Sequence, residues 1–213
     1  IVASSTLSPE FSLAFQTAGI PVVHSFGRFA SAPRVHVVGI NNIECGRMAA
    51  RTLLARGYRR IAFLGGPAEA TSTIDRRRGF LEVLEATPGV NMSESYAAAY
   101  SFDAGRAEML RLLQGHPAEA YFCGDDVVAV GALSALSENG RRVPEDVGVI
   151  GLNDMEMAHW QSINLTTIRQ PIRQIIDSSI ELVIAMLDTP ERAPEARLYG
   201  CEIIERGTLR ALP

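Results

Sequence analysis

The sequence predicts an α/β fold in which parallel sheets are covered by helices on both faces. Short apolar runs alternate with amphipathic stretches, several helical stretches end at glycine or proline, and two apolar runs within 120–171 lead directly into short polar residues. Strands that alternate with helices at this spacing are joined by crossovers, so neighbouring strands run parallel. Ligands bind outside the carboxyl ends of such strands, and the polar residues at 125–126 and 153–154 are therefore the expected functional region.

The first hundred residues predict a regular series of strands and helices. Strands are expected at 1–3, 21–24, 35–39, 60–65 and 97–100. Helices are expected at 9–18, at about 43–55 and at 74–85. The second of these helices is predicted to end at Gly57, because glycine favours the position just after a helix.

The series continues through the second half of the chain. A helix is expected at about 103–113, an apolar strand from 120, a helix at 127–136 that stops at Gly140, and an apolar strand that ends at Asn153. Pro171 suits the first position of a long amphipathic helix, whose apolar residues recur at helical spacing and are Ile172, Ile176, Ile180, Ile184 and Leu187. Pro190 closes this helix, and a last strand is expected at 198–204. The pattern alone does not decide between one sheet and two.

Composition sets independent bounds on function. The chain has 213 residues, 47% of them hydrophobic, which suffices for one sizeable core or two modest ones. Its net charge of −4 argues against a nucleic-acid surface on this piece, because binding to duplex DNA requires a concentrated basic patch. No apolar run approaches the roughly 20 residues that cross a bilayer. We therefore expect no membrane partner and a cytoplasmic location.

The reactive side chains do not form the motifs of catalysis. The three cysteines are far apart and are expected to be reduced thiols, and the four histidines, His24, His36, His116 and His159, are isolated. No HExxH, GxSxG or GxxxxGK motif and no GxGxxG after a strand is present. We therefore expect no catalytic residues, no metal site and no cofactor, and a protein that is not an enzyme.

Three motifs occur in order in the most informative stretch of the chain. They are GDDVVAVGAL, RRVPEDVGVIGLND and LTTIRQP, and RGYRRIAFLGGP, RRRGF and EIIERGTLR support them elsewhere. Together they resemble the effector-binding domain of the LacI/GalR family of bacterial transcription regulators, over nearly the whole chain from Ile1 to Arg210. The resemblance implies a periplasmic-binding-protein-like fold with two doubly wound lobes, three chain crossings and an effector cleft between the lobes.

The resemblance also implies where the lobes divide and what should precede them. One lobe is expected at 1–56 plus 171–200, and the other at 57–170 plus 201–213. The family's first strand-helix units, its hinge and its helix-turn-helix headpiece should come before Ile1. We therefore expect a fragment whose N-terminal lobe is incomplete.

Four residues of the second lobe match effector-contacting positions of the family. Arg76 would offer the rigid fork of a guanidinium to hydroxyl or carboxylate groups, although a surface arginine at a helix start is the alternative. Of the two neighbouring aspartates, Asp125 is assigned to the ligand and Asp126 to the cap of the following helix. Asn153 departs from the family, which commonly has an aspartate there, and is otherwise an Asx-turn residue. Tyr100 would place its ring against the ligand or would pack within a strand.

In the first lobe, Ser4 and Asn42 are weaker ligand candidates, because small polar residues are common at strand ends. If Arg76 and Asp125 both face the cleft while Asn153 is neutral, the formal charge of the site is near zero. A neutral or singly charged sugar, sugar acid or related polyol then fits better than a polyanion.

The function implied by the resemblance is that of an effector-binding and dimerisation domain. Such a domain senses a small molecule and allosterically controls a homodimeric repressor, which contacts operator DNA only through a headpiece absent from this chain. A periplasmic sugar-binding protein of a transport system shares the fold and is the alternative.

Overall fold

The computed structural model describes residues 1–3, 14–15, 17–26, 35–189 and 192–213. The chain forms two compact units, 1–41 plus 170–201 and 42–169 plus 202–213, and so passes between them three times, as the family resemblance implies. The first passage falls at 41/42, whereas the sequence analysis placed it after residue 56. Helix α2 (Asn42–Ala55) accounts for the difference, because it packs against α3 (Thr71–Glu85) of the second unit.

The first unit contains a four-stranded parallel sheet. Its strands are β1 (Val2–Ala3), β2 (Val23–Ser25), β3 (His36–Ile40) and β9 (Ala196–Tyr199), in the order β1-β2-β3-β9. Helix α6 (Ile172–Asp188) packs on this sheet. The expected helix at 9–18 lies mostly outside the described residues.

The sheet-facing side of α6 differs from the apolar side that the sequence suggested. Its buried residues are Ile175, Ser178, Ser179 and Leu182. The hydroxyl of Ser179 lies 2.7 Å from that of Ser25 on β2 and also donates to the carbonyl of Ile175. The periodic isoleucines at 172, 176, 180 and 184 are exposed. The periodic apolar pattern therefore does not mark the side of α6 that faces the sheet.

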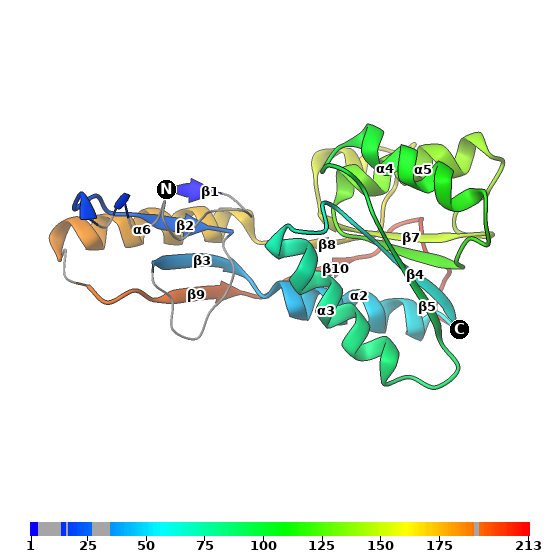
Figure 1. The fold of residues 1–213 in the computed structure, drawn as a ribbon, viewed down its shortest axis with the longest axis horizontal. Coiled ribbons are helices and arrows are strands. Elements are labelled where there is room, and N and C mark those ends of the chain that lie inside the picture. Colours follow the sequence, from blue (N-terminus) through cyan, green and yellow to red (C-terminus); the bar gives the residue numbers. More distant parts are fainter. Residues whose placement is uncertain (4–13, 16, 27–34, 190–191) are drawn as a thin grey trace. The chain divides into compact units, whose positions relative to one another are not determined.

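The second unit contains a six-stranded sheet in the order β10-β8-β7-β6-β4-β5. Its strands are β4 (Arg60–Gly65), β5 (Asn91–Tyr96), β6 (Ala120–Cys123), β7 (Gly148–Asn153), β8 (Thr167–Arg169) and β10 (Glu202–Ile204). All pairings are parallel except that of β10 with β8. Helices α2 and α3 cover one face, and α4 (Phe102–Leu113) and α5 (Asp126–Glu138) cover the other (Figure 1). The doubly wound parallel fold is confirmed.

Two of the expected strands were misplaced for identifiable reasons. Strand β5 ends at Tyr96, and the expected strand at 97–100 is a turn. Strand β5 is an edge strand whose first four residues are exposed, so it lacks an apolar signal. The expected last strand at 198–204 is divided into β9 and β10, which belong to different sheets, because the chain passes between the units at 201/202.

The cores of the second unit lie on the two faces of its sheet. Phe63, Phe80 and Phe122 are fully buried on the α3 side, with ring centroids 5.3 to 6.0 Å apart. The other face combines large side chains such as Tyr121 and Met109 with the alanines 129 and 132 of α5. Both faces of the sheet are thus buried under helices.

Glycines hold each helix pair at backbone contact. A Cβ atom on Gly79 of α3 would lie 1.8 Å from the carbonyl oxygen of Ile43, and one on Gly46 of α2 would lie 2.0 Å from that of Arg76. The same holds for α4 and α5. A Cβ atom on Gly105 of α4 would lie 2.4 Å from the carbonyl oxygen of Val128, and one on Gly131 of α5 would lie 2.2 Å from that of Phe102. No side chain larger than hydrogen fits at these crossings.

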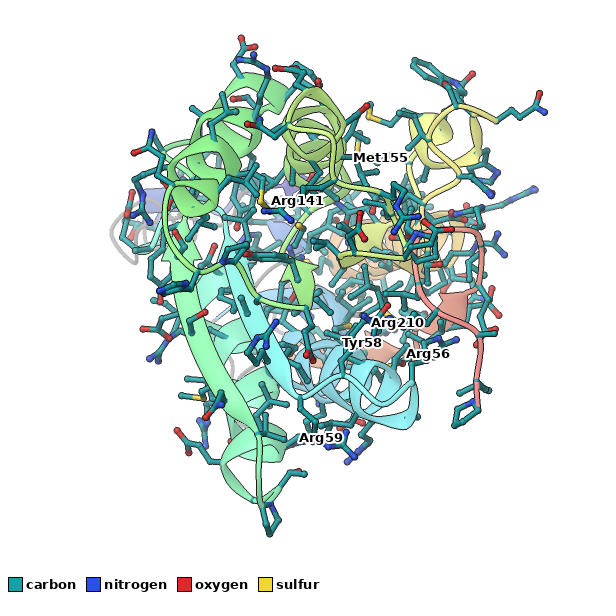
Figure 2. The ribbon with its side chains drawn as sticks, turned by 90° about the vertical axis from the view of Figure 1, so that its right-hand side faces the viewer. Arg56, Tyr58, Arg59, Arg141, Met155 and Arg210 are labelled. Carbon is teal, nitrogen blue, oxygen red and sulfur yellow. The ribbon has the colours of Figure 1, made fainter. Side chains whose placement is uncertain are left out.

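The C-terminal segment packs on Tyr58, which lies just before β4 and therefore near the amino ends of the strands of the second sheet (Figure 2). The Tyr58 hydroxyl accepts a hydrogen bond of 3.0 Å from the backbone N–H of Arg210, and the guanidinium of Arg210 lies 4.6 Å from the ring centroid. Tyr58 itself is fully buried. This contact fixes the chain end against the strand starts, away from the polar carboxyl edge.

Replacing Gly79 by alanine should destabilise the protein by about 2 kcal/mol or more, because the new methyl group forces α2 and α3 apart. Urea unfolding measures the change. Gly115→Ala is the matched control, since its Cβ would meet nothing closer than 3.8 Å. A Gly79→Ala protein as stable as the control would contradict the close-crossing geometry.

Replacing Tyr58 by phenylalanine should reduce the free energy of unfolding by about 1 kcal/mol, because the N–H of Arg210 loses its acceptor while the ring remains. Arg210→Ala keeps that backbone bond and removes the cation from the ring, with an expected loss of about 0.5 kcal/mol. Equal stability of wild type and Tyr58→Phe in thermal and urea unfolding would refute the role of the hydroxyl.

Candidate functional site

The ends of β6 and β7 meet at the carboxyl edge of the second sheet. Asp125 follows β6 and accepts two hydrogen bonds, one of 2.8 Å from the backbone N–H of Val127 and one of 2.7 Å from the Asn153 side-chain amide. Asp125 is the N-cap of α5, with extended backbone angles. The assignment of the cap to Asp126 was therefore wrong, and Asp125 combines the cap with the strand-end position.

Asp126 is the first residue of α5, and its side chain turns into the fold. It is 0% exposed and accepts hydrogen bonds from the Thr167 hydroxyl, at 2.6 Å, and from the backbone N–H of Met155, at 2.8 Å. Burial raises the pKa of Asp126 to about 6, and the nearby Asp125 and Asp154 act in the same direction. A carboxyl group is thus held between the end of β7 and the strand β8.

Arg76 lies in the second turn of α3 and is 7% exposed. Its Nε donates to the Asn42 side-chain oxygen at 2.8 Å, and its Nη1 donates to the backbone carbonyl of Gly124. The alternative of a surface arginine is therefore wrong. Among the described residues both acceptors are neutral, and the rest of the guanidinium fork remains for other acceptors.

The charge of Arg76 acts on Asp125, which follows Gly124 directly. Burial is the main influence on Asp125 and raises its pKa, while Arg76 and the hydrogen bonds to the carboxylate offset only part of this rise. Arg76, Asn42, Asp125 and Asn153 thus form a connected group at the ends of α2, β6 and β7. The sequence singled out each of these residues, and the structure brings them together in one unit, Asn42 included.

Tyr100 is held separately, in the turn after β5. Its hydroxyl lies 2.9 Å from that of Ser72 and 2.7 Å from that of Thr73, in the first turn of α3. Its ring covers Gly66, where a Cβ would lie 2.3 Å from the ring. The alternative of packing within a strand does not apply, because Tyr100 lies in a turn. Ser4 lies outside the described residues.

The turn after β7 has an unfavourable backbone. Asn153 has a φ of 128° and Asp154 a φ of 58°, values that cost L-residues about 1–3 kcal/mol each when the surroundings enforce them. Such conformations persist only where neighbouring contacts hold them, and they are concentrated at functional sites. The strain marks the same turn that the sequence singled out.

Asp154 forms an ion cluster that the sequence analysis missed. Arg169 and Arg206 each donate to it at 2.6 Å, and the His159 ring lies 3.2 Å away. Burial opposes ionisation of Asp154, but the two arginine hydrogen bonds outweigh it and lower its pKa. Arg169 also binds Glu202 at 2.9 Å. These partners are distant in sequence, so only the strand order β10-β8-β7 reveals them.

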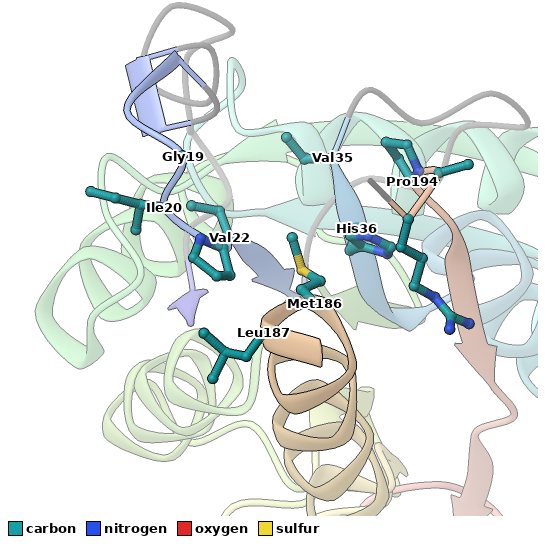
Figure 3. Close-up of a pocket in the computed structure, with 11 residues that line it drawn as sticks. Gly19, Ile20, Val22, Val35, His36, Met186, Leu187 and Pro194 are labelled. Carbon is teal, nitrogen blue, oxygen red and sulfur yellow. The ribbon is translucent and has the colours of Figure 1, made fainter. Parts of the chain in front are cut away.

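A cavity of about 470 Å³ lies in the first unit, at the amino ends of β2 and β3 (Figure 3). Ile20, Val22, Met186 and Leu187 contribute apolar walls, and His36 also lines the cavity. The sequence analysis did not anticipate this cavity. It opens at strand starts, opposite to where parallel sheets bind ligands, and is not the candidate site.

Within the described part of the chain, no helix is long and apolar enough to cross a membrane. The same residues contain no group of three or more His, Cys, Asp and Glu side chains that could hold a metal ion.

Comparison with known proteins gives concordant matches. Residues 50–209 match the model of the periplasmic binding protein-like domain. The chain is 32% identical to the HTH-type transcriptional repressor CytR of Escherichia coli strain K12, over 91% of this chain and 58% of CytR. It is 31% identical to the HTH-type transcriptional repressor PurR of E. coli O1:K1, over 97% of this chain and 61% of PurR.

Among solved structures, the transcriptional regulator CelR in complex with cellobiose is similar, with 30% identity, a TM-score of 0.87, and coverage of 97% of this chain and 64% of CelR. The chain thus spans about three fifths of the length of the curated relatives that it matches. It belongs to the periplasmic-binding-protein-like domain family, in the form found in LacI/GalR-family regulators.

Proposed function

We propose that this chain is the effector-sensing domain of a bacterial transcriptional repressor, and that its effector is a small polyhydroxylated molecule. The observation that carries the proposal is the buried Arg76, whose guanidinium is anchored by Asn42 and Gly124 beside the pair Asp125 and Asn153. CytR and PurR are named transcriptional repressors and CelR a transcriptional regulator, which supports the regulatory role.

The chemistry of the group fits hydroxyl ligands. Arg76 supplies donors in a rigid plane, Asp125 supplies acceptors, and the amide of Asn153 has both functions. A sugar hydroxyl both donates and accepts, so adjacent hydroxyls can bridge a guanidinium and a carboxylate. CelR was solved with cellobiose, which is a neutral ligand of this kind.

The charges favour a neutral or singly charged effector. One cation, Arg76, lies near one anion, Asp125, while Arg169 and Arg206 are paired with the acids Asp154 and Glu202. A multiply charged anion would meet the carboxylate of Asp125, and the two further arginines nearby already bind acids. We infer a neutral sugar or related polyol, or a sugar acid, as the effector class.

In the intact protein, we propose that the effector controls operator binding by a homodimer. An effector shifts the equilibrium only by the difference between its affinities for the two conformations. Operator half-sites are related by two-fold symmetry, which matches a dimer. DNA contact itself would be made by a headpiece outside this chain.

Thermal-shift measurements with cellobiose, ribose, gluconate and glucose 6-phosphate test the effector class. A cognate ligand at about 100 times its Kd should add about 2.7 kcal/mol to the free energy of unfolding and raise Tm. Stabilisation by a neutral or singly charged compound is expected. Stabilisation by the phosphorylated sugar alone would overturn the charge argument.

Arg76→Lys should weaken the binding of the stabilising compound at least about tenfold in calorimetric titration, because an ammonium group cannot reproduce the planar fork held by Asn42 and Gly124. The matched control is Arg77→Lys on the same helix, since Arg77 binds Glu94 on the surface. The control should bind within about twofold of wild type. Equal affinities of the two variants would remove Arg76 from the site.

A further inference from the structure

The strained turn at the end of β7 is fixed by three side-chain anchors. Asn153 donates to Asp125, Asp154 accepts from Arg169 and Arg206, and the backbone N–H of Met155 donates to Asp126. The first two anchors act on side chains of the turn. The third is the side-chain anchor that acts on the backbone, where it adds to the pairing of Asn153 with Arg169 of β8 and to the hydrogen bond from the N–H of Ala158 to the Met155 carbonyl. Asp126 is therefore placed to fix the path of the chain directly after Asn153 and Asp154.

Asp126 is itself fixed from the other side. Its second carboxylate oxygen accepts from the hydroxyl of Thr167 on β8, and both Asp126 and Thr167 are fully buried. Gly151 of β7 provides the necessary space, because a Cβ at that position would lie 2.2 Å from the carboxylate oxygen. The carboxyl group therefore joins the start of α5, the first residue of β8 and the turn after β7.

Two donors, an N–H and an O–H, converge on this carboxyl group. An acceptor-only group suits them, although burial makes its negative charge costly. The nearby charges do not relieve that cost, because Asp125 and Asp154 both disfavour ionisation of Asp126. Among the described residues, the hydrogen bonds that this carboxyl group accepts come from the turn and from β8, so a role in holding the turn explains its burial better than the stability of the fold does.

We propose that Asp126 is a positioning residue: by holding the N–H of Met155 against β8, it fixes the backbone turn that presents the Asn153 side chain to Asp125 and to the effector. The part of this role that concerns the effector rests on the proposed function. The part that concerns the turn can be tested on the free protein.

Asp126→Ala removes both contacts and should release the turn. In ¹⁵N NMR spectra, amide exchange of Met155 should become at least about tenfold faster, beyond any acceleration at Ile150 in the same strand, and the Asn153 side-chain amide signal should move. Asp126→Asn should restore both readouts to within about threefold of wild type, since its oxygen accepts from Met155 and its NH₂ group donates to Thr167.

Asp146→Asn is the matched control. The Asp146 carboxylate accepts hydrogen bonds from the side chain and the backbone N–H of Arg142, on the surface of the same unit. Replacing Asp146 should therefore leave the signals of Met155 and Asn153 unchanged. Equal acceleration at Met155 and Ile150 in Asp126→Ala would show general destabilisation and overturn the proposal. If Asp126→Ala does not fold, Thr167→Val removes one of the two contacts, and wild-type exchange at Met155 in that variant would also overturn it.

A pH titration adds a second readout. With a pKa near 6, Asp126 binds a proton in the folded state that it lacks in the unfolded state between about pH 4 and 6. Its contribution to the free energy of unfolding therefore falls as pH rises through this range. The Met155 amide shift should follow a midpoint near pH 6 in wild type. The part of this titration that Asp126 supplies should be lost in Asp126→Asn, in which the other charged and titratable groups near the turn, Asp125, Asp154, His159, Arg169 and Arg206, are unchanged.

Titration with cellobiose separates the two proposals. If wild type binds it, Asp126→Ala should lower the affinity at least about tenfold and Asp146→Asn should not. If wild type does not bind it, cellobiose is excluded as an effector, while the exchange measurements still decide the positioning role. Unchanged cellobiose affinity in Asp126→Ala would exclude the role of Asp126 in effector contact.

Discussion

The backbone contact between α2 and α3 is the constraint on which the candidate site depends. Gly79 meets the carbonyl of Ile43, and Gly46 meets the carbonyl of Arg76. One carbonyl belongs to Arg76, and the other belongs to Ile43, which follows Asn42 in the chain. Arg76 and Asn42 are joined by a hydrogen bond of 2.8 Å. The crossing that excludes every side chain is thus the crossing that aims the guanidinium at the sheet edge. A wider crossing would leave a buried cation without its partners, a costly arrangement.

The electrostatics of the site follow from which carboxyl groups have cations nearby. Asp154 binds two arginines and keeps its charge, whereas Asp126 has neutral partners and a raised pKa. Asp125 lies between these cases, because burial raises its pKa and Arg76 offsets part of the rise. Three neighbouring acids therefore have three different environments. This division allows one carboxylate to face Arg76 while the others hold the turn and β8.

Sequence reasoning succeeded where a signal was local and failed where it was spatial. The bounds of β4 and the polar ends of β6 and β7 could be predicted because an apolar run leads straight into polar residues. Strand β5 escaped prediction because an edge strand needs no apolar face. Helix α6 misled because two serines share its buried side with Ile175 and Leu182, whereas the periodic isoleucines at 172, 176, 180 and 184 are exposed. The cap was assigned to the wrong aspartate, since either neighbour can serve and only the backbone angles at Asp125 distinguish them.

Asn153 first stood out as a departure from a family that commonly has aspartate at this position. The hydrogen bond from its amide to Asp125 gives the exchange a physical reason. With aspartate at 153, two carboxylates would meet at hydrogen-bond distance beside the buried Asp126, and like charges so close cannot both remain ionised. Asp125 already supplies a carboxylate. With an amide at 153, the pair therefore has one anion, and Asn153 adds a hydrogen-bond donor. The departure at 153 is therefore compensated at 125. The strand ends keep one carboxylate and one amide, which is the pair on which the proposed recognition of a neutral hydroxylated effector rests.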